Sequence, residues 1–176
     1  MLGATLVDVF ETDAELAEMQ AMFDAHFERA NQHMRGIVKP SRRLTAKQVV
    51  LHLSGVRHVA FATVTSRSEP RVSPLDTLFI HGRFTVSTGS GATRLAHLRR
   101  NPACSAVHME GDRIAVVANG TVDWINREHP DHDEIHRTWT DTYESDPYSW
   151  GDGVVLFRIQ PRSMWAYAFH PEEFPE

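Results

Sequence analysis

The chain has 176 residues, of which 41% are hydrophobic and 23% are charged, and its formal net charge is −5. These proportions are typical of folded globular proteins and exclude wholesale disorder. The acidic balance disfavours nonspecific binding to the phosphate backbone of a nucleic acid. The single cysteine, Cys104, excludes an intramolecular disulfide and a cysteine-rich metal site.

The start of the chain, MLGATLVDVFETD, has no basic region before its apolar residues, so we do not interpret it as a signal peptide. No apolar run approaches the roughly 20 residues that a membrane-spanning helix needs. We therefore expect a cytoplasmic protein that binds neither membrane nor nucleic acid.

Two helices are predicted near the start of the chain, over residues 13–34 and 45–53, with Asp13 and Thr45 as their N-caps. The first helix has apolar residues at spacings of three and four: Leu16, Met19, Phe23 and Phe27. We expect residues 1–44 to form an N-terminal helical arm and residues 45–176 to form the main domain.

Short β-branched segments joined by tight turns follow these helices. His81-Gly82 predicts a tight hairpin, and Pro74 predicts an edge or a bulge in its strand. Tight turns imply antiparallel pairing, which predicts a mainly β, α+β fold: a six-stranded antiparallel barrel with peripheral helices. The expected strands are 58–65, 71–80, 83–88, 103–109, 113–124 and a last pair, 154–159 and 163–169; the expected later helices are 92–100 and 127–143.

Hydroxyl side chains and glycines precede a predicted helix in the segment Ser87–Arg94. Glycines let the backbone approach a ligand closely, and the first N–H groups of a helix suit a phosphate. Arg94 adds a bidentate fork for phosphate oxygens, and Arg71, at the start of a neighbouring strand, could close over the same anion. The segment predicts a phosphomonoester pocket at the barrel rim; the alternative is a solvated loop.

The segment Val59–Trp124 resembles the FMN-binding split barrel of the pyridoxamine 5′-phosphate oxidase family, and the resemblance extends over about residues 45–169. The family's T-x-x-S-x-K-x-x-x-L-R-x-N-P run corresponds to Thr88–Pro102, which ends in LRRNP. Gly120, in VVANGTVDWI, fits the strand that follows in these barrels. The order and spacing of these elements carry the resemblance.

The resemblance implies a homodimer that binds FMN at the subunit interface. The strand 71–75 would follow the isoalloxazine edge, with Arg71 near the phosphate. Thr93 and Arg94 would hold the phosphate, and Trp150 of the partner subunit could cover the ring. The implied cofactor-binding residues are Arg71, Val72, Ser73, Pro74, Leu75, Ser87, Thr88, Thr93, Arg94 and Trp150.

Three departures from the family pattern bear on function. Arg94 stands where the family has lysine, and residues 66–70 replace the usual D-G-x-P turn. The C-terminal R-L-H-D-R signature of the true pyridoxamine phosphate oxidases is absent, which argues against vitamin B6 synthesis. The chain is more similar to the broader group of flavin and deazaflavin reductases with this barrel.

These observations favour an FMN-dependent oxidoreductase that acts on a small organic substrate. A reductase that uses the deazaflavin coenzyme F-420 is the first competing hypothesis. The acidic tail of that coenzyme could bind to a basic run of the chain: Lys39, Arg42, Arg43 and Lys47. A non-catalytic protein that binds or senses flavin or heme is a second hypothesis. A structural protein that has lost its cofactor is a third.

No catalytic acid or base is identified. His58, His108 and Tyr143 are candidates for proton delivery, although packing is the favoured interpretation of a histidine on a strand. The cluster His129, His132 and His136 is a metal candidate because His132 and His136 lie one helical turn apart. A polar helix start explains the cluster better, so no metal site is predicted. Cys104 is interpreted as a small core hydrophobe.

Overall fold

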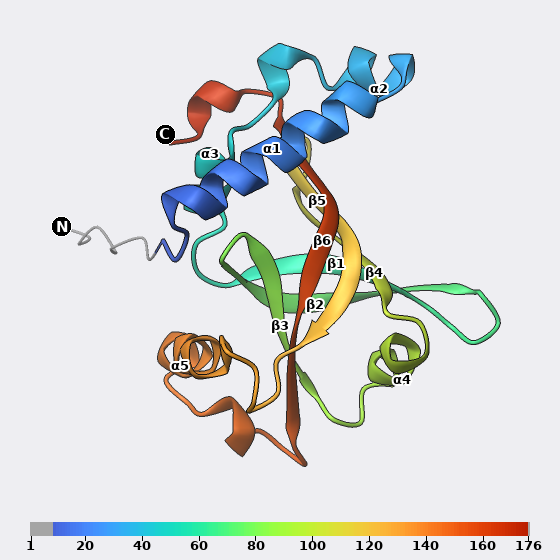
Figure 1. Cartoon of the computed structure of the whole chain (residues 1–176), viewed down its shortest axis with the longest axis vertical. Coiled ribbons are helices and arrows are strands. Elements are labelled where there is room, and N and C mark those ends of the chain that lie inside the picture. The colour runs from blue at the N-terminus through green and yellow to red at the C-terminus, as the bar shows by residue number, and fades with distance from the viewer. Residues whose placement is uncertain (1–8, 176) are drawn as a thin grey trace.

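Six antiparallel strands close into a barrel in the computed structural model, which describes residues 9–175 (Figure 1). The strand order around the barrel is β1-β2-β3-β6-β5-β4, and β4 pairs with β1 to close it. The predicted mainly β barrel with peripheral helices is confirmed. The strands are β1 Arg57–Val64, β2 Pro70–Ile80, β3 Arg83–Gly89, β4 Ala103–Glu110, β5 Ile114–Trp124 and β6 Val154–Ala168.

Apolar side chains from all sides fill the barrel. Val59 and Phe61 alternate with less buried residues along β1, as a half-buried strand requires. Phe61 packs against Phe157 of β6, with ring centroids 5.6 Å apart, and Leu98 belongs to the same buried cluster. Because side chains fill this interior, a ligand must bind at the ends or on the outside of the barrel.

The turn between β2 and β3 is the predicted hairpin. His81 and Gly82 have φ angles of 53° and 70°, the left-handed pair that a type I′ turn requires. Pro74 pairs with Ala60 of β1, whereas the β2–β3 ladder includes only Leu78–Ile80 of β2. Pro74 therefore lies where β1 is the paired neighbour of β2, which agrees with the predicted edge position.

The predicted pair of last strands is wrong, because β6 is one strand of 15 residues. It pairs with β5 from Phe157 to Ala168, and the register shifts between Asn119 and Gly120. Gly120 permits this close crossing, since a Cβ there would lie 2.0 Å from the carbonyl oxygen of Gln160. This bulge accommodates Pro161 without ending the strand.

The helices differ from the prediction mainly at their ends. The expected helix 13–34 is divided, because Asn31 accepts a hydrogen bond from the Met34 N–H and begins a second helix. Thr12, rather than Asp13, caps the first helix and forms a capping box with Glu15. The α-helices are α1 Asp13–Arg29, α2 Gln32–Ile37, α3 Ala46–His52, α4 Thr93–Arg100 and α5 His132–Tyr143; the 3-10 turns are η1 Pro40–Arg42, η2 Pro147–Ser149 and η3 Pro171–Glu173.

The polar helix α5 starts later than the predicted residue 127. A turn forms first, in which the His129 N–H donates to the Asn126 carbonyl and Pro130 follows. A residue before proline is disfavoured in helical geometry, so the helix begins beyond Pro130.

Helix α1 lies across one end of the barrel and packs against β6 (Figure 1). Its Met19 and Phe23 are buried in the same cluster as barrel residues. The division of the chain into an arm, 1–44, and a domain, 45–176, remains a prediction. No helix of the described residues has the length and apolar composition that crossing a membrane requires.

His81 joins three elements and makes stability depend on pH. Its Nε2 lies 3.1 Å from Glu134 of α5, and its Nδ1 lies 3.0 Å from Glu15 of α1 without hydrogen-bond alignment. Burial alone would lower the pKa of His81, but the two carboxylates outweigh it and the pKa is raised. The folded state therefore binds this proton more tightly than the unfolded state does.

We expect the His81 contribution to stability to be complete below about pH 6.5, the pKa of an unperturbed histidine, and to be lost as pH rises through the folded-state pKa. Urea unfolding at pH 6 and pH 8 measures it. His81→Asn is the matched variant, because asparagine also suits a left-handed turn position. If the unfolding free energy changed equally between pH 6 and pH 8 in the wild type and in His81→Asn, His81 would not be the source of this pH dependence.

Candidate functional site

A cleft of about 560 Å³ lies between the β1–β2 turn and the start of α4. It brings together five of the ten predicted cofactor-binding residues, which come from β2 and from α4. They are Arg71, Val72, Ser73, Thr93 and Arg94; the other lining residues are Thr63, Thr65, Ser66, Arg67, Glu69, Ala92 and His97.

Arg94 is the half-buried cation of this cleft. Its Nη1 donates to Thr88 Oγ1 at 2.6 Å, and its Nε lies 3.4 Å from Ser73 Oγ. Burial lowers the pKa of Arg94, yet a guanidinium stays charged at neutral pH. Among residues 9–175 no carboxylate forms an ion pair with Arg94. Such a half-buried positive charge favours an anionic ligand.

The first turn of α4 adds backbone donors beside Arg94. Its N-cap residue, Ala92, has no side-chain acceptor, and no side-chain capping bond is present. The first N–H groups of a helix have no intrahelical partner and carry partial positive charge. An anion held by Arg94 could accept from these groups, as phosphates do at other helix N-termini.

The two arginines on the opposite wall are already paired. Arg71 Nη2 lies 2.9 Å from Glu69 Oε2, and Arg67 Nε lies 3.4 Å from Glu69 Oε1. A phosphate that approached Arg71 would therefore compete with the Glu69 carboxylate. The cleft has one arginine free of carboxylates among the described residues, Arg94, and two that share one carboxylate.

Sequence reasoning did not identify Thr63 and His97. The Oγ1 of Thr63 lies 3.0 Å from His97 Nδ1, and both side chains line the cleft. The signal was present in the spacing, because His97 follows Arg94 by three residues and so shares its helix face.

Four of the predicted residues lie on β2 or β3 but do not line the cleft: Pro74, Leu75, Ser87 and Thr88. Leu75 is buried in the barrel core, so its side chain is not available to a ligand in the cleft. Thr88 reaches the cleft through its hydrogen bond with Arg94, whereas its neighbour Ser87 points to the opposite face of β3. Their roles in binding remain predictions.

Trp150 lies outside the cleft, in a second apolar cluster that also contains Trp139. Its indole N–H donates to Ser145 Oγ at 3.0 Å, and its ring packs edge-on against Tyr143. A contribution of Trp150 to the site of a partner subunit remains a prediction.

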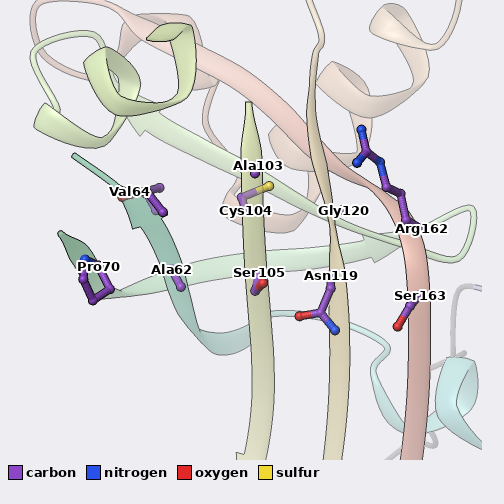
Figure 2. A pocket seen from close by; sticks show the side chains of 11 residues that line it. Ala62, Val64, Pro70, Ala103, Cys104, Ser105, Asn119, Gly120, Arg162 and Ser163 are labelled. Atoms are coloured by element: carbon purple, nitrogen blue, oxygen red, sulfur yellow. The ribbon is translucent and has the colours of Figure 1, made fainter. Parts of the chain in front are cut away.

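A second hollow, of about 350 Å³, lies on the outside of the barrel and adjoins the cleft at Thr63. Figure 2 shows its lining, in which small side chains of β1, β4, β5 and β6 lie near the longer side chain of Arg162. Ala62, Ser105, Asn119 and Ser163 are successive cross-strand partners, so they form one row on this face. The row offers little side-chain bulk to a molecule that lies against it.

The candidate proton donors lie elsewhere. His58 Nε2 is 3.2 Å from Asp76 Oδ1, and Tyr143 donates to Asp76 Oδ2 at 3.3 Å. Burial, followed by the Asp76 charge, raises the pKa of Tyr143 to about 12. Burial also raises the pKa of Cys104 to about 12, so its thiol is not a nucleophile at neutral pH. His108 is buried at the far end of β4.

The three metal candidates do not converge as a ligand set, and the two that lie on α5 stack on each other. His132 and His136 stack with ring centroids 5.7 Å apart. His132 Nε2 lies 2.8 Å from Tyr148 Oη, and His136 Nε2 lies 2.8 Å from Asp146 Oδ1. His129 faces Asp123, with 3.5 Å between Nε2 and Oδ2.

The basic run proposed for a deazaflavin tail lies around η1 and α3, at the end of the barrel away from α4 (Figure 1). Two of its members cover aromatic rings of this chain. Arg42 lies 4.1 Å from the Phe169 ring centroid, and Arg43 lies 4.2 Å from that of Phe27. These contacts give the two arginines a packing role.

No family model matches the sequence, and no curated protein matches it either. Solved structures do match. The heme storage protein HutZ from Vibrio cholerae is 19% identical, with a TM-score of 0.56 over 66% of this chain and 89% of that chain. A candidate pyridoxamine 5′-phosphate oxidase from Listeria innocua is 17% identical, with a TM-score of 0.50 over 61% and 86%.

An F-420 reductase is also 17% identical, with a TM-score of 0.50 over 64% of this chain and 91% of that chain. At these identities the likeness establishes the fold alone, and the three proteins differ in what they are described as: a heme storage protein, a candidate pyridoxamine 5′-phosphate oxidase and an F-420 reductase. The chain therefore has the split-barrel fold of the pyridoxamine 5′-phosphate oxidase-like proteins.

Proposed function

We propose that the cleft at α4 binds the phosphate of FMN and that the protein is an FMN-dependent oxidoreductase of small organic substrates. One observation carries this proposal: the half-buried Arg94 guanidinium, which has no carboxylate partner among the described residues, lies at an uncapped helix start beside two hydroxyl groups. A phosphate dianion matches this set of donors in charge and in hydrogen-bonding capacity.

The surroundings also suit the rest of a flavin. Val72, beside Arg71 at the cleft wall, is 67% exposed and offers apolar surface to a flat ring. Bound flavin would supply the hydride chemistry, while the chain would bind and orient it and exclude water. Arg94 and the first turn of α4 would fix the phosphate, and the strand 71–75 would set the position of the ring.

The outer row of small side chains supports a homodimer. Ala62, Ser105 and Asn119 leave room for a second copy of the chain to approach next to the cleft. In that arrangement the partner subunit, with Trp150 as the predicted residue, would cover the ring. Sedimentation analysis tests this part, and we expect a dimer.

The experiment that tests the proposed function begins with the absorption spectrum of the purified protein and the mass of any ligand released on denaturation. Titration with FMN, riboflavin, F-420 and heme follows. We expect FMN to bind more tightly than riboflavin, which lacks the phosphate. Tight binding of F-420 or heme instead of FMN would identify that molecule as the cofactor. If none of the four molecules bound, the result would indicate a structural protein.

Turnover is measured separately, as reduction of the bound flavin by nicotinamide donors and its reoxidation by organic acceptors. We expect cycling with at least one pair. If no donor reduced the bound FMN, the oxidoreductase assignment would be wrong, and the protein would store or sense flavin.

A substitution at Glu69 tests the proposal through an expected increase in FMN affinity. Because its carboxylate pairs with Arg67 and Arg71, Glu69→Gln frees both cations for the phosphate. We expect the FMN dissociation constant to fall about two- to fivefold, the size of an exposed ion pair, and the gain to shrink at high salt. Fluorescence titration measures it, with the exposed Glu28→Gln as the control. Unchanged or weaker binding would place the phosphate away from Arg71.

A further inference from the structure

Two histidines and a glutamate converge at the end of β4: His52 comes from the last position of α3, and His108 and Glu110 come from β4. His52 Nε2 lies 3.0 Å from Glu110 Oε1, and His108 Nε2 lies 3.4 Å from the same oxygen. All three ligand atoms lie within 4.8 Å of one another. Neither the cofactor cleft nor the proposed function uses these residues, and β4 separates them from α4.

The distances suit a shared metal ion. Zinc binds imidazole nitrogen and carboxylate oxygen at about 2.0–2.2 Å, so tetrahedral geometry places neighbouring ligand atoms about 3.4 Å apart. The two Nε2-to-Oε1 distances, 3.0 and 3.4 Å, are close to this value. A small shift of side chains would therefore bring His52, His108 and Glu110 onto one ion.

The groups behind the ligands hold them in the orientation that a metal requires. His108 Nδ1 lies 2.9 Å from the His58 carbonyl oxygen, so Nδ1 carries the hydrogen and Nε2 is the nitrogen that faces Glu110. Arg113 Nη1 donates to Glu110 Oε2 at 2.9 Å, which leaves Oε1 directed at the histidines. Outer partners of this kind orient metal-ligating histidines and carboxylates.

The local charge and packing also permit a cation. Arg113 lies 3.7 Å from Glu173 as well, and Arg57 donates to the His52 carbonyl, so two carboxylates balance two arginines around the histidines. The Phe174 ring packs edge-on against His52, with centroids 5.0 Å apart, and forms an apolar wall. The Glu110 side chain is 36% exposed, which leaves an approach for the ion and for a water ligand.

We propose that His52, His108 and Glu110 bind one divalent transition-metal ion, with Zn²⁺ as the fitting ion and water in the remaining position. Two imidazoles and one carboxylate form a set that binds zinc in proteins and leaves one coordination position open. The ion would connect α3 to β4.

The test titrates Zn²⁺ into the full-length, chelator-treated protein in competition with a chromogenic chelator, and records the absorption of the Co²⁺ form. We expect one ion per chain and tetrahedral Co²⁺ bands. Glu110→Gln and His108→Gln should each weaken zinc binding by more than the roughly tenfold effect expected of the outer variant Arg113→Met. Circular dichroism shows that each variant is folded.

The controls remove histidine side chains that the proposal does not use: His58→Gln, which keeps the backbone carbonyl that orients His108, and the pair His132→Gln with His136→Gln. We expect unchanged zinc affinity in both. A wild-type protein that binds no Zn²⁺ would overturn the proposal even if the ligand variants do not fold. Unchanged affinity in folded Glu110→Gln and His108→Gln, or loss of the ion in the His132/His136 pair, would also overturn it.

Discussion

Replacing Arg158 by alanine is expected to lower the free energy of unfolding by about 3 kcal/mol. Arg158 lies on β6 and is 7% exposed. Its Nε donates to Asp123 Oδ2 at 2.8 Å, and its Nη1 donates to Asp131 Oδ2 at 2.7 Å. One guanidinium thus joins β6 to β5 and to the start of α5.

The expected loss of stability comes from the two carboxylate charges that remain after the substitution of Arg158. Burial alone would raise the pKa of Asp131, but the hydrogen bond and the charge of Arg158 outweigh it and lower that pKa. In Arg158→Ala both carboxylates lose their compensating charge, and breaking a buried pair costs about 3–5 kcal/mol. The lower figure applies because Asp123 and Asp131 are partly exposed.

Urea unfolding of the wild type and Arg158→Ala measures this effect. Arg137→Ala is the control, since Arg137 is exposed on α5, and we expect a change within about 0.5 kcal/mol. Adding Asp123→Asn and Asp131→Asn to Arg158→Ala should recover part of the loss. A single variant as stable as the control would show that the network does not stabilise the fold.

The fold could be predicted because local signals and the global topology agree. β-Branched segments, the His81-Gly82 turn and the Thr45 N-cap each indicate their own element and need no distant contact. The error at β6 has a distant cause. The gap between the two predicted strands contains Pro161, and only its position opposite Gly120 on β5 lets the strand continue through it.

The parts of the candidate site formed by residues close in the sequence could be predicted, and the parts that depend on distant segments could not. Arg94 and Thr93 follow from the glycine-rich turn before α4. The pairing of Arg71 with Glu69, and the separation of Ser87 from Thr88 onto opposite faces of β3, require the register of the sheet. His52, on α3, and His108 lie 56 positions apart in the sequence, so no spacing rule could place them together.

Arg94→Ala is expected to weaken FMN binding about 10- to 150-fold. This range corresponds to about 1.5–3 kcal/mol, the contribution of hydrogen bonds to a charged group. The Arg94 side chain contacts only Thr88 and Ser73 by hydrogen bonds among the described residues, so its removal should leave the barrel folded. Riboflavin has no phosphate, and we expect its affinity to stay unchanged.

Three further variants separate charge from geometry. Arg94→Lys keeps the charge without the fork and should bind FMN with intermediate affinity, as lysine offers a point charge. Arg94→Ala combined with Arg71→Ala should abolish binding. Arg100→Ala, exposed at the end of the same helix, is the control. Flavin fluorescence titrations measure each dissociation constant. If the double variant bound FMN as tightly as the wild type, the phosphate would have to lie outside the α4 cleft. An equal loss of affinity for FMN and riboflavin in Arg94→Ala would show that Arg94 supports the ring rather than the phosphate.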